Sequence, residues 1–233
     1  MRLRSLILWD IRFQARYGFY FLYAVLTAIY VAVLSAVPEG GREKATAILI
    51  FSDPASMGLF FMGAIVLLEK SQRTPAALAL SPVRAEEYIA AKVVSLSAIS
   101  LAVAAVLAAA AGVGAGEHGI VKLHIVLPGT VMSSAVFTLL GIIIATRIGS
   151  LNQFVLWTVP VELVCFVPAI LHLFRAAPAW LRHCPAAVCM DMVSGHAPSP
   201  TGILTVMALT ALLFAAAKHC VLNMWAQMGG AKL

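Results

Sequence analysis

Residues 69–92 read EKSQRTPAALALSPVRAEEYIAAK, and they form a polar segment between two long apolar runs. The chain has 233 residues, of which 62% are hydrophobic and only 11% are charged. Soluble domains are about half apolar and about a quarter charged. We therefore expect the apolar runs to cross a membrane and the polar segment to lie outside it.

The apolar runs have the length of membrane spans, since a helix needs about 20 apolar residues to cross about 30 Å of hydrocarbon. They predict an all-α, polytopic membrane protein with about six transmembrane helices in a single transmembrane domain, residues 1–233. The remaining residues leave no room for a soluble catalytic domain. The predicted spans cover approximately residues 17–37, 45–68, 93–113, 125–146, 154–174 and 201–217.

Two segments outside these spans are predicted to be helical. Residues 1–16 place Leu6, Ile7 and Phe13 opposite Arg4 and Arg12, which is typical of a helix that lies in the membrane interface. Alternatively, they extend the first span into the cytoplasm. Residues 175–200 are too apolar for a free loop and too interrupted by proline for a span, which favours a short interfacial or re-entrant broken helix on the extracytoplasmic side.

The distribution of basic residues predicts the orientation in the plasma (inner) membrane. Cytoplasmic loops carry an excess of Lys and Arg, and a cytoplasmic N-terminus satisfies this rule. Both termini and residues 69–92 are then cytoplasmic. The net charge of +6 therefore does not indicate nucleic-acid binding. The basic residues then inside are Arg2, Arg4, Arg12, Arg16, Lys70, Arg73, Arg84, Lys92, Arg147, Lys218 and Lys232; those outside are Arg42, Lys44, Lys122, Arg175 and Arg182.

Two carboxylates, Asp53 and Glu162, fall within predicted spans. A charge in lipid is costly, so each should face the bundle, a pathway or a partner. Pro54 should kink or break the second span, and Asp53 either caps a helix that restarts there or contacts substrate. If both carboxylates carry ions or protons, the chain is a stand-alone ion- or proton-coupled transporter.

No catalytic constellation is present, because the sequence has no P-loop, no GxSxG elbow and no HExxH motif. We expect a non-enzymatic protein that binds no cofactor and no metal itself. Cys184 and Cys189 share the 175–200 segment and could pair as a disulfide if it faces an oxidising compartment, or remain free thiols. A metal site with His183 and His196 is the weaker alternative, because the spacing matches no familiar zinc pattern.

The polar segment resembles the signature of type-2 ABC exporter permeases. In that family a Glu and a basic residue end the second span, a Leu-rich turn and a Ser/Thr-Pro pair follow, and an aromatic residue precedes the Lys or Arg that opens the third span. Arg73 stands where the family usually has Gly before Thr74, and Pro75 stands where Leu is common, so the helical turn begins at Pro75. In chain order the residues that correspond to the pattern are Glu69, Lys70, Arg73, Thr74, Leu78, Leu80, Ser81, Pro82, Val83, Glu87, Tyr88 and Lys92.

The resemblance implies a permease subunit that couples to a separate ABC ATPase, which carries ATP and Mg. Residues 69–92 would be the cytoplasmic coupling segment, with Leu78 and Leu80 filling a groove on the ATPase and charged residues around them. A second permease subunit, identical or not, would complete the path for a hydrophobic or amphipathic substrate such as a drug or lipid. The run from Arg12 to Ala24 is most similar to drug exporters of the fluoroquinolone type.

Overall fold

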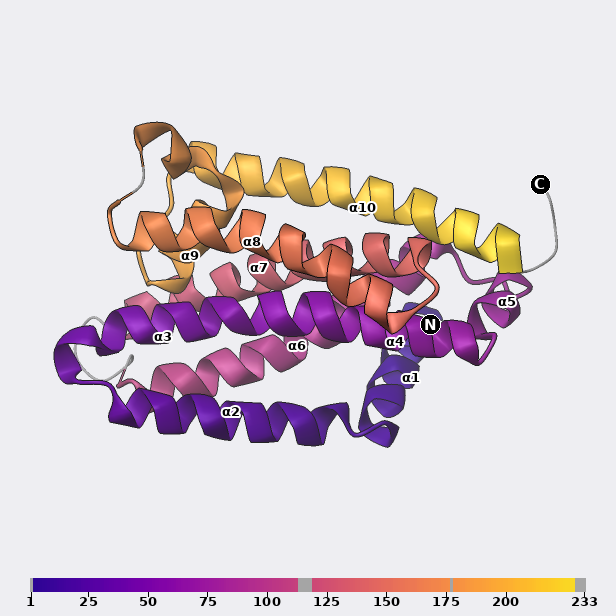
Figure 1. The fold of residues 1–233 in the computed structure, drawn as a ribbon, viewed down its shortest axis with the longest axis horizontal. Helices are drawn as coiled ribbons and strands as arrows, with labels where there is room; N and C mark the ends of the chain where they lie inside the picture. The colour runs from indigo at the N-terminus through magenta and orange to yellow at the C-terminus, as the bar shows by residue number, and fades with distance from the viewer. Residues whose placement is uncertain (1, 113–118, 177, 229–233) are drawn as a thin grey trace.

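The computed structural model describes residues 2–112, 119–176 and 178–228, and every regular element in these ranges is a helix (Figure 1). The all-α prediction is therefore confirmed. In chain order the elements are α1 (Arg2–Arg16), α2 (Phe19–Ala36), α3 (Glu39–Asp53), the π-helix η1 (Pro54–Phe61), α4 (Met62–Ser71), α5 (Thr74–Ala79), α6 (Ala85–Ala110), α7 (Gly119–Arg147), α8 (Leu151–Leu173), the 3₁₀ helix η2 (Ala179–His183), α9 (Pro185–Val193) and α10 (Pro200–Met228).

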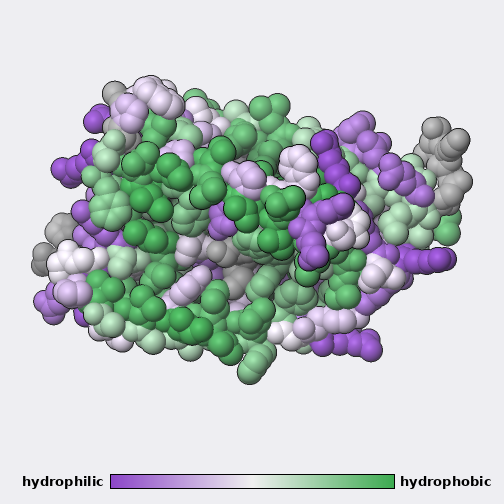
Figure 2. All heavy atoms as spheres, in the orientation of Figure 1, coloured by the Kyte–Doolittle hydropathy of each residue, from purple (hydrophilic) through white to green (hydrophobic). Residues whose placement is uncertain are grey.

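Six helices in the described residues are long and apolar enough to cross a membrane, which confirms the predicted number of spans. In the three central spans, α3–η1–α4, α6 and α7, between 50% and 61% of the residues of an 18-residue apolar stretch are buried, but under a fifth are buried in α2, α8 and α10. The peripheral helices turn apolar side chains outward, as lipid-facing helices do. Figure 2 shows such side chains over the middle of one face, with hydrophilic residues gathered toward its two ends.

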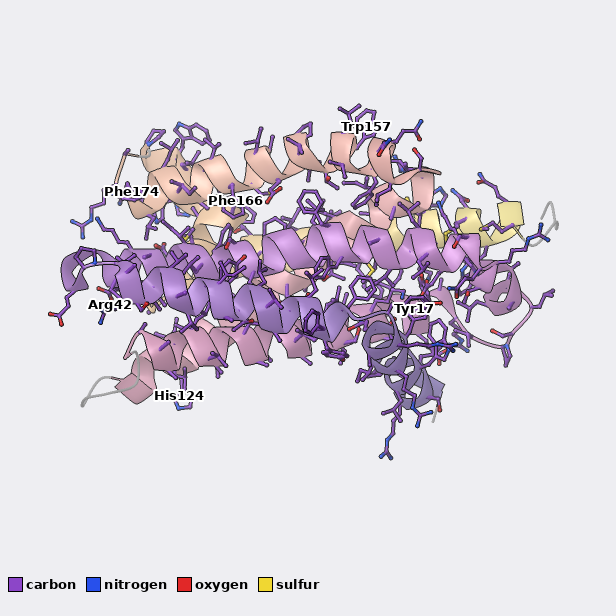
Figure 3. All side chains as sticks on the ribbon, turned by 60° about the horizontal axis from the view of Figure 1, so that its bottom comes forward. Tyr17, Arg42, His124, Trp157, Phe166 and Phe174 are labelled. Atoms are coloured by element: carbon purple, nitrogen blue, oxygen red, sulfur yellow. The ribbon has the colours of Figure 1, made fainter. Side chains whose placement is uncertain are left out.

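The two ends of the bundle differ in what they carry. Helices α1 and α5 and the C-terminal end of α10 lie toward one end, whereas η2, α9 and the turn from α2 to α3 lie at the other (Figure 1). Tyr17 lies toward the first end, and Arg42, His124 and Phe174 lie at the second (Figure 3). An even number of spans brings the two termini to the same end.

Some predicted boundaries were wrong because charged residues join the helices. Arg42 and Lys44, which precede the predicted second span (residues 45–68), belong to the first turns of α3, which begins directly after Pro38. The third span begins at Ala85 rather than residue 93, since the Glu87 carboxylate accepts a hydrogen bond from the Arg84 backbone N–H at 2.9 Å and caps the helix. Its predicted end at residue 113 lies outside the described residues.

The second span neither breaks nor restarts at Pro54. It changes there into the π-helix η1 and returns to α-helix at Met62. A widened turn is a common way to absorb a missing backbone donor. This segment packs tightly on α7: a Cβ added to Gly141 would lie 2.9 Å from the carbonyl oxygens of Gly58 and Leu59. Glycine is therefore required where these two helices meet.

The segment between α8 and α10 folds back into the bundle. Helix α9 packs against α7, α8 and α10, and most of its side chains are buried. The predicted disulfide is not formed, since Cys184 and Cys189 are both free thiols. Five residues of helix separate their Cα atoms by about 7.5 Å along the axis, beyond the reach of a disulfide. Burial raises the pKa of the Cys189 thiol to about 11.

Candidate functional site

The candidate site begins where the chain leaves the second span. After α4 the backbone turns at Arg73, whose φ of 57° is left-handed, and α5 follows with Pro75 at its second position. Proline fits the first turn of a helix because no donor is needed there. Ser81 ends α5: its hydroxyl donates to the Leu78 carbonyl at 2.7 Å and accepts from the Val83 N–H at 3.3 Å. Ser81 therefore shapes the turn.

Beneath this turn lies a buried ion network. The Lys92 ammonium on α6 is 2.8 Å from the Asp10 carboxylate on α1 and 2.7 Å from the Glu69 carboxylate on α4. Their side chains are 1%, 2% and 0% exposed, respectively. Three helices that are distant in sequence are thus joined through one ammonium group. Losing the Lys92 ammonium would leave two buried carboxylates without a counter-charge.

Neighbouring side chains complete the network. The Tyr88 hydroxyl donates to Glu69 at 2.6 Å, and the Gln14 amide donates to Asp10 at 2.8 Å and to the Ser95 hydroxyl at 3.1 Å. Ser95 in turn donates to the same oxygen of Asp10. Nearly every polar atom is satisfied, with only the Gln14 amide oxygen lacking a partner among the described residues. We call Asp10, Gln14, Glu69, Tyr88, Lys92 and Ser95 the buried ion network.

Lys70 makes a second connection, to α7. Its ammonium donates to the backbone carbonyls of Ala145, Thr146 and Ile148, at 2.7, 2.9 and 2.8 Å. These carbonyls lie at the C-terminal end of α7, where the helix leaves acceptors without partners and favours a positive charge. The Glu69-Lys70 pair therefore ties the base of α5 to three other helices.

The opposite side of the turn is exposed. Leu80, directly after α5, is 86% exposed. Leu78, by contrast, is half-buried and packs against the hydrophobic core. The sequence predicted that both leucines fill a groove on a partner, but in the structure only Leu80 is exposed and Leu78 packs inward. The side chains of Arg73, Pro82, Arg84 and Glu86 are also exposed around it, and those of Thr74 and Glu87 are half-buried.

The site has the character of a rigid joint with an exposed tip. In the described residues no group of three His, Cys, Asp or Glu side chains is placed to hold a metal ion. The network links helices through charge and hydrogen bonds, and α5 packs against α4 and α10. Lys218 on α10 also reaches Glu86 at 2.6 Å, in an exposed pair. The turn that carries Leu80 is therefore fixed by contacts with several helices.

Asp10 and Gln14 were missed by the sequence analysis, although the pattern of the first helix held a signal. Asp10 lies three or four positions from Leu6, Ile7 and Phe13, and therefore on the apolar face of the helix. An acidic residue on such a face needs a buried partner. That partner could not be identified from sequence, because Lys92 is 82 positions away.

Asp53 and Glu162 lie apart from this network, in the interior of the bundle and on α8. Asp53 is 2% exposed, and the Ser100 hydroxyl approaches its carboxylate, yet neither carboxylate oxygen completes a hydrogen bond. Its helical φ and ψ and the lack of a capping bond show that the predicted helix cap is wrong. Glu162 is half-buried, and Tyr30 of α2 lies within electrostatic reach of both carboxylates.

Comparison with known proteins matches nearly the whole chain. The model of the fluoroquinolones export permease protein family covers residues 1–228. Fluoroquinolones export permease proteins of Mycobacterium tuberculosis, from strains CDC 1551 / Oshkosh and H37Rv, are each 33% identical over 154 residues. The match covers 65% of this chain and 63% of each relative, so the chain spans less than two thirds of the length of these relatives.

Proposed function

Because this chain belongs to the fluoroquinolones export permease protein family, we propose that it is the membrane-spanning subunit of an ATP-driven drug exporter. A separate ABC ATPase, which carries ATP and Mg, would dock at the α5 turn. The observation that supports this most is the position of the exposed Leu80, which lies on the turn between Glu69 and Tyr88, two members of the buried ion network.

The coupling step follows from the energetics of that network. Separating Lys92 from either carboxylate would leave that carboxylate buried and unpaired, at a cost of about 3–5 kcal/mol. The ends of α1, α4 and α6 therefore move as one body when the α5 turn is pushed. Closure of the ATPase would displace these three helices together, whereas helices held only by apolar contacts could slide. The non-catalytic chain needs no chemistry of its own for this step.

The substrate path is proposed to involve Asp53 and Glu162. A second permease subunit, identical or different, would form the opposite wall of this path. Glu162 lies on α8, whose neighbouring residues Leu163 and Val164 are exposed. A carboxylate on such a helix is costly against lipid and is better placed at a pathway or a subunit boundary. A fluoroquinolone is the first substrate to test, because the relatives carry that name.

Transport in inverted membrane vesicles tests the proposal. The permease is coproduced with a candidate partner ABC ATPase, and fluoroquinolone uptake is followed with ATP and with a non-hydrolysable analogue. We expect uptake only when permease, ATPase and ATP are all present. An ATPase variant that cannot hydrolyse ATP is the matched control, and it should abolish uptake without changing the amount of permease in the membrane.

An ion- or proton-coupled transporter is the second candidate, and it is favoured by the Asp53 carboxylate, which completes no hydrogen bond with the part of the chain that the structure describes. Such a protein would move substrate without the ATPase, driven by an imposed pH or sodium gradient. Gradient-driven uptake by the permease alone, abolished in Asp53→Asn, would replace the exporter proposal. Uptake that is independent of the gradient and requires ATP would exclude the ion- or proton-coupled transporter.

A further inference from the structure

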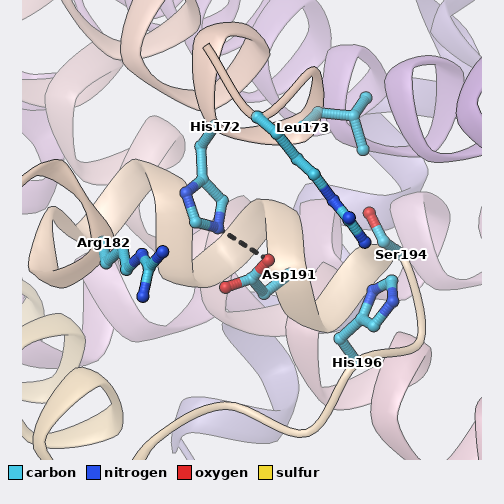
Figure 4. Close-up of a pocket in the computed structure, with 7 residues that line it drawn as sticks. His172, Leu173, Arg182, Asp191, Ser194 and His196 are labelled. Carbon is cyan, nitrogen blue, oxygen red and sulfur yellow. Dashed lines mark hydrogen bonds and ion pairs between the residues drawn. The ribbon is translucent and has the colours of Figure 1, made fainter. Parts of the chain in front are cut away.

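A cavity of about 380 Å³ opens at the end of the bundle opposite α5 (Figure 4). This volume is within the range of small-molecule sites. In Figure 4, Arg182 lies on one side of the His172–Asp191 pair, and Ser194 and His196 lie on the other. The cavity is lined by His172, Leu173, Arg175, Arg182, Asp191, Ser194 and His196.

Two helix C-termini build this cavity with the same kind of turn. At the end of α8 the Ala176 N–H donates to the Leu171 carbonyl, and at the end of α9 the His196 N–H donates to the Asp191 carbonyl, both at 2.9 Å. Each turn contains one left-handed residue, which is usually glycine. In α9 it is Gly195, with φ of 77°.

In α8 the left-handed residue is Arg175, with φ of 56°. A side chain is disfavoured in this conformation, which glycine adopts freely. Strained residues of this kind are found at functional sites more often than elsewhere. The turn alone would favour glycine at this position. Because the Arg175 side chain also lines the cavity, a role in the cavity would explain why arginine is found there.

The charges around the cavity favour an anion. The single carboxylate, Asp191, is engaged by the His172 imidazole, with Nε2 to Oδ1 at 2.9 Å. Arg175 and Arg182 form no ion pair with any residue that the structure describes. Positive groups also stabilise helix C-termini, which accounts for basic residues near these ends but not for a cavity between them. Guanidinium groups bind carboxylate and phosphate oxygens in a bidentate manner.

We propose that this cavity binds the oxyanion of an amphipathic molecule, a carboxylate or a phosphate, between Arg175 and Arg182. A fluoroquinolone carries one carboxylate, so an exported drug could supply the group; a lipid headgroup phosphate could supply it instead. The first source rests on the proposed function, because it takes the drug as cargo. The second does not depend on it.

Binding to the purified permease without the ATPase tests the cavity directly. In nanodiscs of phosphatidylcholine, the fluorescence anisotropy of a fluoroquinolone is titrated and compared with that of its methyl ester. We expect Arg175→Gly and Arg182→Gln each to weaken drug binding about tenfold to a hundredfold, and the ester to bind the wild type as weakly. Arg147→Gln, at the other end of the bundle, is the charge-matched control and should bind normally.

Arg175→Gly separates a binding role from a structural one, because glycine relaxes the left-handed turn. Its Tm should equal or exceed that of the wild type, whereas Arg175→Lys, which keeps the charge but loses the bidentate geometry, should bind more weakly than the wild type and more tightly than Arg175→Gly. In a second arm, phosphatidylglycerol is added to the permease in neutral detergent. A rise in Tm that the wild type shows and Arg175→Gly lacks would assign the site to a lipid phosphate.

If Arg175→Gly and Arg182→Gln match the wild type in both arms, the site is refuted. These assays contain no ATPase, so the two proposals fail separately. Normal carboxylate-dependent binding without ATP-driven transport would contradict the exporter and leave the cavity assigned.

Discussion

The ammonium group of Lys92 lies between two carboxylates where almost no water reaches it. The attraction in a buried ion pair is largely offset by desolvation, so Lys92 stabilises the fold mainly because its removal would leave buried carboxylates unpaired. Two negative groups, on α1 and α4, would then face each other without compensation. The residue is therefore needed for the position of both helices.

Replacing this ammonium should be costly in a way that an exposed lysine is not. We expect Lys92→Met to lower the free energy of unfolding by about 3–5 kcal/mol, measured by denaturation in mixed detergent micelles. Lys218→Met, which removes the exposed pair with Glu86 at 2.6 Å, should change it by about 1 kcal/mol or less. Equal stabilities of the two variants would contradict a structural role for the network.

Asp53 should behave in the opposite way. Its oxygens complete no hydrogen bond in the described structure, so the charge is a cost to folding. Asp53→Asn should keep or raise Tm and slow the transport of cationic compounds about tenfold, as loss of a charged contact would. Ser52→Ala on the same turn is the control. A lower Tm with unchanged transport would mean that the carboxylate is structural.

Sequence alone identified Glu69, Tyr88 and Lys92 through a family pattern and did not reveal what they do. Their order along the chain carries the resemblance, but their meeting with Asp10 depends on how α1 packs on α6. Leu78 and Leu80 show the same limit: both looked suited to a partner, and only the packing of α5 decides that one turns inward.

Among the elements, the second span shows most clearly which features follow from the sequence and which depend on packing. Pro54 predicts a disturbance, but not that the chain would absorb it in a π-helix and continue. That outcome depends on α7, which offers Gly141 and accepts the widened turn closely. The starts of two spans were also predicted wrongly. Arg42 and Glu87 lie in the first turns of α3 and α6, and a hydropathy pattern excludes charged residues from a predicted span.

Gly141→Ala should disturb this contact. The added Cβ would lie 2.9 Å from two carbonyl oxygens of η1, which are backbone atoms and cannot move alone. Overpacking of this kind costs about 1–3 kcal/mol, and the variant should unfold earlier by that amount in detergent. Gly149→Ala has no atom within 4 Å of the added Cβ and should be neutral. A neutral Gly141→Ala would mean that η1 and α7 do not approach so closely.

For the whole molecule, composition and the lengths of the apolar runs were enough to predict the six spans, and the structure places α1, α5 and the C-terminal end of α10 toward one end of the bundle. Which end faces the cytoplasm is a prediction from the basic residues. The cavity at the other end could not be predicted, because its residues come from α8, η2 and α9, and no motif joins them.

Cysteine labelling tests the orientation. With the native cysteines replaced by serine, Gly40→Cys and Ser71→Cys place exposed thiols at opposite ends of the second span. A membrane-impermeant maleimide should label Gly40→Cys in intact cells and reach Ser71→Cys only after permeabilisation. Labelling of Ser71→Cys in intact cells would invert the topology and remove the α5 turn from the side where ATP is available.

The central claim, that the α5 turn docks on an ABC ATPase, is tested most directly by copurification of the ATPase with Leu80→Asp. Burying a leucine contributes about 1.5–3 kcal/mol, so placing a charge at this 86% exposed tip should weaken the complex about tenfold to a hundredfold. Leu151→Asp, another exposed leucine near the same end, is the matched control. The account predicts loss of the ATPase from Leu80→Asp alone, with the permease folded and in the membrane. Undiminished copurification and coupled transport in that variant would contradict it.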